Sequence, residues 1–330
     1  MIDHNLQKEL FNYIKNVVPP HIAMVDTVAD LLDISHDSVY RRLRGEKPIT
    51  LDELKLLCEH FNISLDQAMQ LKTDSVIFKD YEPGVVSSSF LQYLQGMLRQ
   101  MQYIANFENR QLLYLAKDVP VFHLFLSEEL TAFKSFFFEK SILNNPDFEG
   151  KNFSLKDFDC KPYYDIGKQI LEKYYSINST ELWNYESISS SVSQIEYYRD
   201  AGIFENEEDV KIIVNALDRM LDHLQKQAEK GCKFLPGTSE ISSKGSLQFY
   251  INEIILGNNS IMIEMNGTKA AFINHVVLKY VSTTDKRFTQ KLFDNFYNLT
   301  SRSTLISSTG ERDRNKFFKV LREKVAVLKK

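Results

Sequence analysis

Cysteine is scarce in this sequence: three residues, Cys58, Cys160 and Cys232, lie far apart in a chain of 330. Their separation excludes a CxxC metal-binding pair, and their odd number excludes a fully paired disulfide framework. We therefore expect three reduced thiols and a fold that depends on its apolar core. Cys58 falls on the apolar face of an expected helix and is interpreted as a small core residue.

Long apolar runs are also missing, although 43% of the residues are hydrophobic. No segment approaches the roughly 20 consecutive apolar residues that a membrane-spanning helix needs. The first ten residues, MIDHNLQKEL, lack the basic-then-apolar order of a signal peptide. We expect a cytoplasmic globular protein without a membrane partner.

Motifs for catalysis and for cofactor binding are absent as well. The seven histidines form no HExxH motif, and the sequence contains no GxGxxG, no phosphate-binding GxxxxGK and no GxSxG. The sequence therefore predicts no metal, no cofactor and no enzymatic activity. Two scattered catalytic candidates remain, His123 with Asp118 and His223 with Asp222, and a structural role is the usual one for such neighbours.

A strong excess of positive charge, which would favour non-specific binding to nucleic acid, is lacking too. The formal net charge is −4, and residues 1–72 hold eight Lys or Arg against eleven Asp or Glu, a net charge of −3. Within residues 38–48, however, three arginines and Lys47 oppose only Glu46, which gives +3. The positive charge is thus concentrated in one short segment, as DNA binding through a single surface requires.

That segment belongs to the one stretch whose residue order indicates a specific task, VDTVADLLDISHDSVYRRLRG at residues 25–45. Val28, Leu31 and Leu32 have the spacing of one apolar helical face. Asp33 interrupts the pattern, and Ser35 can cap a second helix by accepting hydrogen bonds from its first free amides. Gly45 and the following Pro48 end that helix near Leu43, so the pattern predicts two short helices joined by a tight turn.

The second helix has a polar outer face. Taking Val39 as inward and advancing about 100° per residue, three positions lie on or beside the core side: His36, Arg42 and Leu43. Three others point away from the core: Asp37, Arg41 and Arg44. Ser38 and Tyr40 flank this outer face. A short helix that turns arginines outward has the form of a DNA-recognition helix, because arginine binds guanine or phosphate with two hydrogen bonds.

Several residues of this stretch carry a resemblance: Val28-Ala29, Leu32, Ile34-Ser35, Val39 and Arg44-Gly45. They resemble the helix-turn-helix of lambda-repressor-like (XRE or BetR type) bacterial transcription regulators. Two positions depart from the family pattern. Asp33 stands where glycine is usual in the turn, and Arg42-Leu43 reverses the usual apolar-polar order. Aspartate adopts a left-handed backbone more readily than most residues, so the turn can still form.

The resemblance implies a five-helix DNA-binding head at residues 1–72. A first helix is expected over residues 3–18, a capping box at Thr50 opens a fourth helix, and a second box at Ser64 opens a short fifth helix. Eight residues are assigned to DNA binding: Thr27, Ser35, Asp37, Ser38, Tyr40, Arg41, Arg44 and Lys47. The partners that the resemblance implies are double-stranded DNA, a second copy of the chain in a homodimer, and a small-molecule or peptide effector.

Beyond the head, residues 73–89 contain Pro83-Gly84 and a serine run, which indicates a linker. Residues 90–235 are interpreted as a helical sensory or dimerisation domain. Its first helix carries an apolar seam at Phe90, Leu94, Met97, Met101 and Ile104, which favours packing in its own core over a dimer contact. The many aromatic residues that follow are interpreted as core, with a ligand cavity as the alternative.

Residues 236–330 are expected to form a small α+β part. Three segments rich in β-branched and aromatic residues, 247–255, 261–265 and 271–281, predict a three-stranded antiparallel meander. Asn266-Gly267 favours a type I′ hairpin, and helices are expected near 285–299 and 311–328. The whole chain is thus predicted to be mainly α, and the residues beyond the head also look like uncharacterised regulators that attach a long helical segment to this motif.

The leading hypothesis is a sequence-specific DNA-binding transcription regulator with a C-terminal effector-sensing or dimerisation region. The alternative is a protein-interaction adaptor whose helix-turn-helix no longer binds DNA and whose acidic surface meets a protein partner. A negative slope of log affinity against log salt on duplex DNA would favour the regulator.

Overall fold

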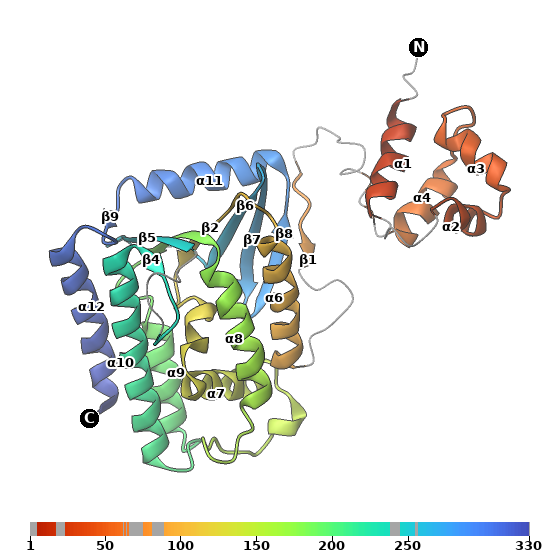
Figure 1. Cartoon of the computed structure of the whole chain (residues 1–330). Coiled ribbons are helices and arrows are strands. Elements are labelled where there is room, and N and C mark those ends of the chain that lie inside the picture. The colour runs from red at the N-terminus through yellow and green to blue at the C-terminus, as the bar shows by residue number, and fades with distance from the viewer. Residues whose placement is uncertain are drawn as a thin grey trace. The chain divides into compact units, whose positions relative to one another are not determined.

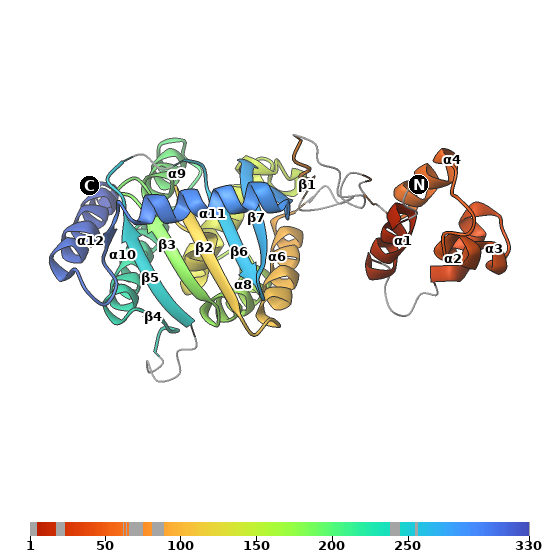
Figure 2. The same cartoon turned by 90° about the horizontal axis from the view of Figure 1, so that it is seen from above.

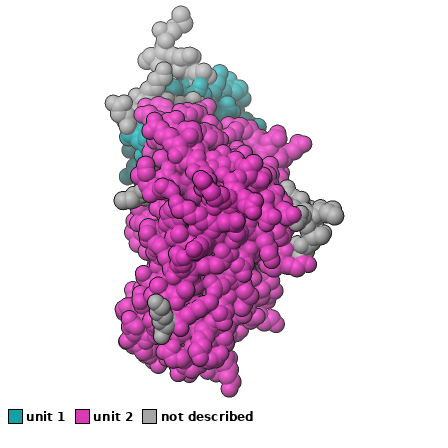
Figure 3. Space-filling view, turned by 90° about the vertical axis from the view of Figure 1, so that its left-hand side faces the viewer, with its two compact units in different colours: residues 1–77 teal, residues 78–330 magenta. Residues whose placement is uncertain are grey.

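The computed structural model describes residues 5–17, 24–61, 63, 65, 75–80, 89–237, 245–254 and 257–329. The chain forms two compact units, residues 1–77 and residues 78–330, which are coloured separately in Figure 3. We call the first the head and the second the sheet unit, and we describe each by itself.

The head is a small helical bundle, drawn in red and orange in Figure 1. Its helices are α1 (Asn5–Val17), α2 (Met24–Leu32), α3 (His36–Leu43) and α4 (Leu51–His60). They meet around a core of fully buried side chains: Leu10, Ile14, Val28, Val39 and Leu57. The first four predicted helices are confirmed, whereas the predicted fifth helix lies outside the described residues apart from Leu65.

The sheet unit is built on one mixed sheet. Its strands are β1 (Lys79–Asp80), β2 (Arg110–Ala116), β3 (Asn178–Trp183), β4 (Cys232–Lys233), β5 (Gly245–Ile251), β6 (Ser260–Met265), β7 (Thr268–Val276), β8 (Lys279–Thr283) and β9 (Thr304–Leu305). The order is β1-β8-β7-β6-β2-β3-β5-β4, with β9 paired to β5. Strands β2, β3 and β5 are parallel, and the other pairs are antiparallel.

Helices cover both faces of this sheet. Figure 2 shows α11 (Lys286–Thr300) running across the strands on one face, where Phe293 and Phe296 pack on Leu113 and Met262. The other helices belong to the larger core of the opposite face or to its edge: α6 (Phe90–Ala105), α7 (Glu128–Phe137), α8 (Lys161–Tyr175), α9 (Ser189–Asp200), α10 (Glu207–Lys230) and α12 (Glu311–Ala326).

The interpretation of residues 90–235 as a helical domain is wrong in part, because the strands β2 and β3 lie in that range. In β2, Leu112 and Tyr114 pack under the helices of one face, whereas Leu113 and Leu115 pack under α11. A strand that is buried on both faces has a continuous apolar run without alternation, and such a run cannot be told from a buried helix by its periodicity.

The predicted three-stranded meander of residues 247–255, 261–265 and 271–281 is also wrong. Strand β5 pairs in parallel with β3 and not with β6. The third predicted strand is two strands, β7 and β8, which are separated by a turn in which Leu278 has φ +64°. The hairpin at Asn266-Gly267 is confirmed: β6 and β7 are antiparallel, and both turn residues have positive φ.

Segments that were predicted to form separate domains thus share one sheet. Residues 90–235 contribute β2, β3 and β4, and residues 236–330 contribute β5 to β9. Within the predicted linker 73–89, β1 pairs with β8 through Lys79 and Asp80. The seam of α6 is buried in the core of its own chain, as its preferred interpretation requires. Over the described residues, no helix combines the length and apolarity that crossing a bilayer would need.

Candidate nucleic-acid interface

The turn between α2 and α3 has the geometry that its sequence predicts. Asp33 has φ +51°, in the left-handed region that an aspartate tolerates better than most residues. The amide of Ile34 donates to the carbonyl of Ala29 at 3.0 Å, which closes the end of α2. Ser35 then has extended backbone, and its side-chain oxygen accepts from the amide of Ser38 at 3.3 Å. The predicted cap at Ser35 is therefore confirmed.

Two side chains hold the inner face of α3 against the head. Val39 is fully buried, and Arg42 is only 3% exposed. The guanidinium of Arg42 donates to Glu53 Oε1 at 2.5 Å and to the carbonyl of Ser38 at 3.4 Å. Because both faces of α3 carry arginines, this pairing decides which arginine is structural. Arg42 lies on the core side, as the helical positions predict.

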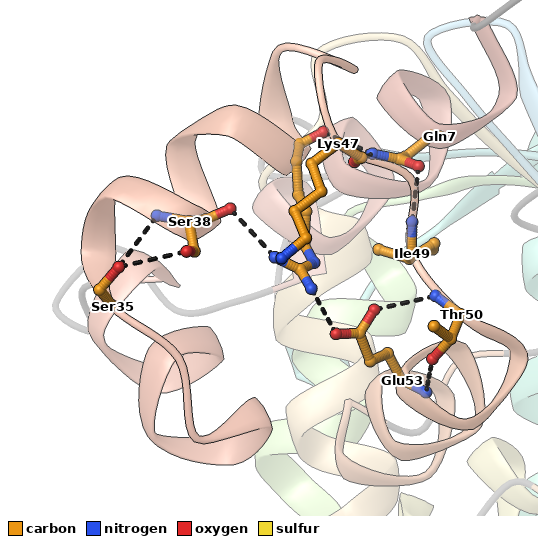
Figure 4. A network of polar contacts seen from close by, with 8 residues as sticks. Gln7, Ser35, Ser38, Lys47, Ile49, Thr50 and Glu53 are labelled. Atoms are coloured by element: carbon orange, nitrogen blue, oxygen red, sulfur yellow. Dashed lines mark hydrogen bonds and ion pairs between the residues drawn. The ribbon is translucent and has the colours of Figure 1, made fainter.

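Glu53 links α3 to the start of α4. Its second oxygen accepts from the amide of Thr50 at 2.8 Å, while Thr50 accepts from the amide of Glu53, which confirms the predicted capping box. Burial opposes ionisation of Glu53, but the hydrogen bonds from Thr50 and Arg42 outweigh it and lower its pKa. Figure 4 shows how these contacts join into one network.

Gln7 of α1 completes the same network, and no role was predicted for it from the sequence. Its side-chain nitrogen donates to the carbonyls of Arg42 at 2.7 Å and Lys47 at 2.9 Å. Its side-chain oxygen accepts from the amide of Ile49 at 3.0 Å (Figure 4). One amide side chain therefore fixes the loop that follows α3. Its partners are backbone groups more than thirty residues away, so no residue pattern in the sequence could have indicated them.

Arg41 and Arg44 lie on the outer side, as predicted, with side chains 52% and 54% exposed. Glu46 contacts both of them. Arg44 Nε lies 2.6 Å and Arg44 Nη2 3.1 Å from its two oxygens, and Arg41 Nε lies 3.8 Å from one. The bond from Arg44 lowers the pKa of Glu46, and the same bond raises the pKa of Arg44. The outward cations are therefore engaged by one carboxylate.

The other residues assigned to DNA binding surround this pair. Tyr40 is 49% exposed. Ser35, Asp37 and Lys47 are exposed, and Thr27 and Ser38 are half-buried. All eight assigned residues belong to the segment that runs from α2 to the loop after α3. Their contacts with DNA remain predictions.

A hollow of about 590 Å³ lies beside α3 and is lined in part by Lys8, Lys15, Asp26, His36 and Tyr40. The side chain of His36 is 62% exposed, and its Nε2 lies 3.3 Å from Asp26 Oδ1. The expectation that His36 lies on or beside the core side is therefore wrong. His36 is the first residue of α3, and its side chain meets the exposed Asp26 of α2.

In neither of the two His–Asp candidates from the sequence does the histidine pair with its aspartate. His123 is buried and its Nε2 lies 3.1 Å from Glu181 Oε1, whereas Asp118 accepts from Asn259 and Ser190. His223 Nε2 lies 2.8 Å from the carbonyl of Phe234. Asp222 instead pairs with Arg322. Among the described residues, no three His, Cys, Asp or Glu side chains gather in a metal-binding arrangement.

Comparison with curated proteins and with solved structures yields no match to this chain. A family model does match part of it. The matched segment begins before α2, contains the turn and the exposed arginines of α3, and continues through β1 into α6. Residues 20–101 are thus similar to the BetR domain, a helix-turn-helix family, in agreement with the geometry of α2 and α3.

Proposed function

We propose that the chain is a sequence-specific DNA-binding transcription regulator of the lambda-repressor-like type. Helix α3 enters the major groove, and Arg41 and Arg44 contact base edges or phosphates. The observation that supports the proposal most directly is that the arginines of α3 have different environments. Arg42 is buried on Glu53, while the other two lie on the exposed side of the second helix of the turn.

The remaining assigned residues take supporting roles in this proposal. Tyr40 and Ser38 lie at the flanks of the contact, and Thr27 and Lys47 approach the DNA backbone. Asp37 is compatible with this surface in two ways. The negative charge of its carboxylate interacts favourably with the positive end of the helix dipole at the N-terminus of α3. The same carboxylate can accept a hydrogen bond from the amino group of a cytosine.

The charge of the head argues for two heads acting together. Its net charge of −3 over residues 1–72 limits the non-specific attraction to phosphates, so the affinity of one head for DNA is modest. A homodimer on a two-fold site, with half-sites about one helical turn (about 34 Å) apart, would add the affinity of a second head. In this proposal the sheet unit dimerises, senses a small-molecule or peptide effector, or does both.

Selection of bound duplexes from a random pool, with the purified full chain, tests the proposal. A DNA-binding dimer enriches a sequence with two-fold symmetry and a fixed half-site spacing. Enrichment of a single motif without a repeat would contradict the dimer but would still support DNA binding. A pool without enrichment would contradict the assignment of α3 as a recognition helix.

The alternative function is that of a protein-interaction adaptor. The observation that favours it is that Glu46 already engages Arg41 and Arg44. A salt titration separates the two functions. A DNA binder shows a negative slope of log affinity against log salt concentration on duplex DNA, because phosphate contacts release counterions. An adaptor shows no measurable affinity for the duplex at any salt concentration.

A further inference from the structure

The hollow of about 590 Å³ beside α3 is lined by both α1 and α3. Helix α1 contributes Lys8, Asn12 and Lys15, whose spacing of four and three residues places them on one face of the helix. Helix α3 contributes His36 and Tyr40, which are one helical turn apart. The polar faces of the two helices thus border the same space.

Lys8 and Lys15 have no acidic partner among the described residues. They differ in this respect from the arginines of the segment 41–44, each of which pairs with a carboxylate of the head. Both lysines are exposed, so their ammonium groups are available to an anion in the hollow.

Asp26 is the one carboxylate among the described residues that line the hollow. Its Oδ1 lies 3.3 Å from Nε2 of His36. Together with Lys8 and Lys15, Asp26 gives the hollow a net charge of +1, and protonation of His36 raises it to +2. The charge of the hollow therefore fits an anionic ligand.

The position of the hollow identifies this anion as the phosphate backbone of duplex DNA. An α-helix with its side chains has a diameter of about 10–12 Å and nearly fills a major groove about 12 Å wide. A sugar-phosphate backbone therefore passes along each flank of a helix that is seated in the groove. His36 and Tyr40 lie on the flank of α3 that faces the hollow. The backbone along this flank runs past the exposed face of α1.

Helix α1 is held in a fixed position relative to α3. Its Gln7 donates to the carbonyl of Arg42 at 2.7 Å, and its Leu10 and Ile14 are fully buried in the core of the head. Phosphate contacts from such an element carry no sequence information, but they fix the orientation of a recognition helix in the groove. Because α1 precedes the segment 20–101, the similarity to the BetR domain gives its lysines no role.

We propose that Lys8 and Lys15 bind phosphates of the DNA backbone that runs along the hollow, and that they thereby set the orientation of α3. The proposal extends the DNA-contacting surface from the segment around α3 to α1. It rests on the proposed function.

A set of selected duplexes, each with one phosphate replaced by an uncharged methylphosphonate, locates the contact. With the natural full chain, the replacement at a contacted position lowers the affinity about fivefold at about 0.15 M salt. This value follows from a salt slope of about 0.9 per phosphate contact, counted from about 1 M salt. In Lys8→Ala or Lys15→Ala, the replacement at the matching position has no further effect, because the lysine and the phosphate share one interaction.

A salt titration of the same variants gives a second readout. Lys8→Ala and Lys15→Ala are each expected to reduce the slope of log affinity against log salt by about 0.9 per head. Each weakens binding to the selected duplex and to an unrelated duplex by the same factor. Lys8→Arg and Lys15→Arg keep the charge and retain the slope. Lys55→Ala removes an equal charge from α4, outside the hollow, and retains the full response to every methylphosphonate.

Two results would overturn the proposal: natural affinity and slope in both alanine variants, or a methylphosphonate response that is the same in these variants and in the natural chain. Both lysines are exposed, so amide hydrogen exchange of α3 is expected to show that the variants fold as the natural chain does. Loss of affinity in Arg41→Ala without any loss in the lysine variants would contradict this inference alone. A natural chain that binds no duplex would contradict the proposed function itself.

Discussion

At the scale of single residues, Glu46 determines whether the arginines of the proposed DNA-contacting surface are available to DNA. Its carboxylate engages Arg44 with two contacts and approaches Arg41. In the free head, Glu46 therefore occupies the guanidinium groups that phosphates and base edges would contact. DNA must displace this carboxylate in order to bind them. In the complex, its negative charge would also lie close to the DNA backbone.

Glu46→Gln is predicted to raise affinity for a selected duplex about three- to tenfold, because it removes both the competition and the repulsion. Titration by fluorescence anisotropy measures this affinity. Glu59→Gln is the matched control, since it removes the same charge from an exposed position of α4, where Glu59 pairs with Lys55. Equal gains in the two variants would mean that net charge alone is responsible.

Arg42 stabilises the head from the inner side of α3, whereas Arg41 and Arg44 lie on the outer side. Arg42→Met leaves the largely buried Glu53 without its guanidinium partner and is predicted to destabilise the head by about 2–3 kcal/mol. The value is below that of a fully buried pair because Glu53 retains 17% exposure. Amide hydrogen exchange in α3 and α4 of the full chain measures the change. Arg41→Met, at an exposed position, should leave these exchange rates nearly unchanged, and equal effects of both substitutions would contradict the structural role of Arg42.

At the scale of elements, the helices could be predicted from the sequence better than the strands. Helices α3 and α4 have a cap at Ser35 and a capping box at Thr50, and both signals act within four residues. Such local hydrogen bonds are visible in a residue pattern. The hairpin at Asn266-Gly267 was predictable for the same reason.

The central strands β2 and β3 were not predictable in this way. Each is buried on both faces, and the partners of β3 at β2 and β5 lie more than sixty residues away. Pairing of this kind depends on how distant segments meet, which a single sequence does not display. The same limit applies to the network of Gln7, whose partners are backbone atoms, and to the engagement of Arg44 by Glu46, which needs a defined loop after α3.

The first amide of α6 is bound by a buried acid, in addition to the side-chain cap that Ser89 supplies to the helix. Glu139 is fully buried and accepts from the amide of Phe90, from the phenol of Tyr163 at 2.9 Å and from the amide group of Asn145 at 2.9 Å. Glu139→Ala is predicted to lower the free energy of unfolding of the sheet unit by about 3 kcal/mol, because it leaves one buried donor, the amide of Phe90, and two half-buried donors without this partner. Urea unfolding followed by the fluorescence of Trp183 reports on this unit. Glu149→Ala, at an exposed position, should have no effect on the same transition.

At the scale of the whole molecule, the sheet unit carries buried ionisable groups that link its stability to pH. Burial lowers the pKa of His223 to about 4, against which the hydrogen bond to Phe234 acts only in part. The unfolded chain, with a histidine pKa near 6.5, therefore binds more protons than the folded chain between about pH 4 and 6.5. Stability must fall as the pH falls through this window.

The predicted loss between pH 7 and pH 5 is roughly 2 kcal/mol, measured by urea unfolding with Trp183 fluorescence. His223→Gln should remove most of this dependence, because glutamine does not titrate. His275→Gln, at an exposed position, should leave it intact. A pH dependence that survives His223→Gln unchanged would contradict the assignment. Below this window a second loss is expected, because the contacts of Glu181 with His123, Tyr174 and Trp183 outweigh its burial and lower its pKa.

In the proposed function, α3 presents Arg41 outward to duplex DNA while the rest of the helix is held by the head. A gel shift that compares the affinities of full-length Arg41→Ala and Lys55→Ala for the selected duplex is the decisive experiment. Lys55 is an exposed cation on α4, so its removal changes the net charge equally. We expect an affinity loss of about 5- to 150-fold for Arg41→Ala and little loss for Lys55→Ala. Equal affinity of Arg41→Ala and the natural chain would contradict it.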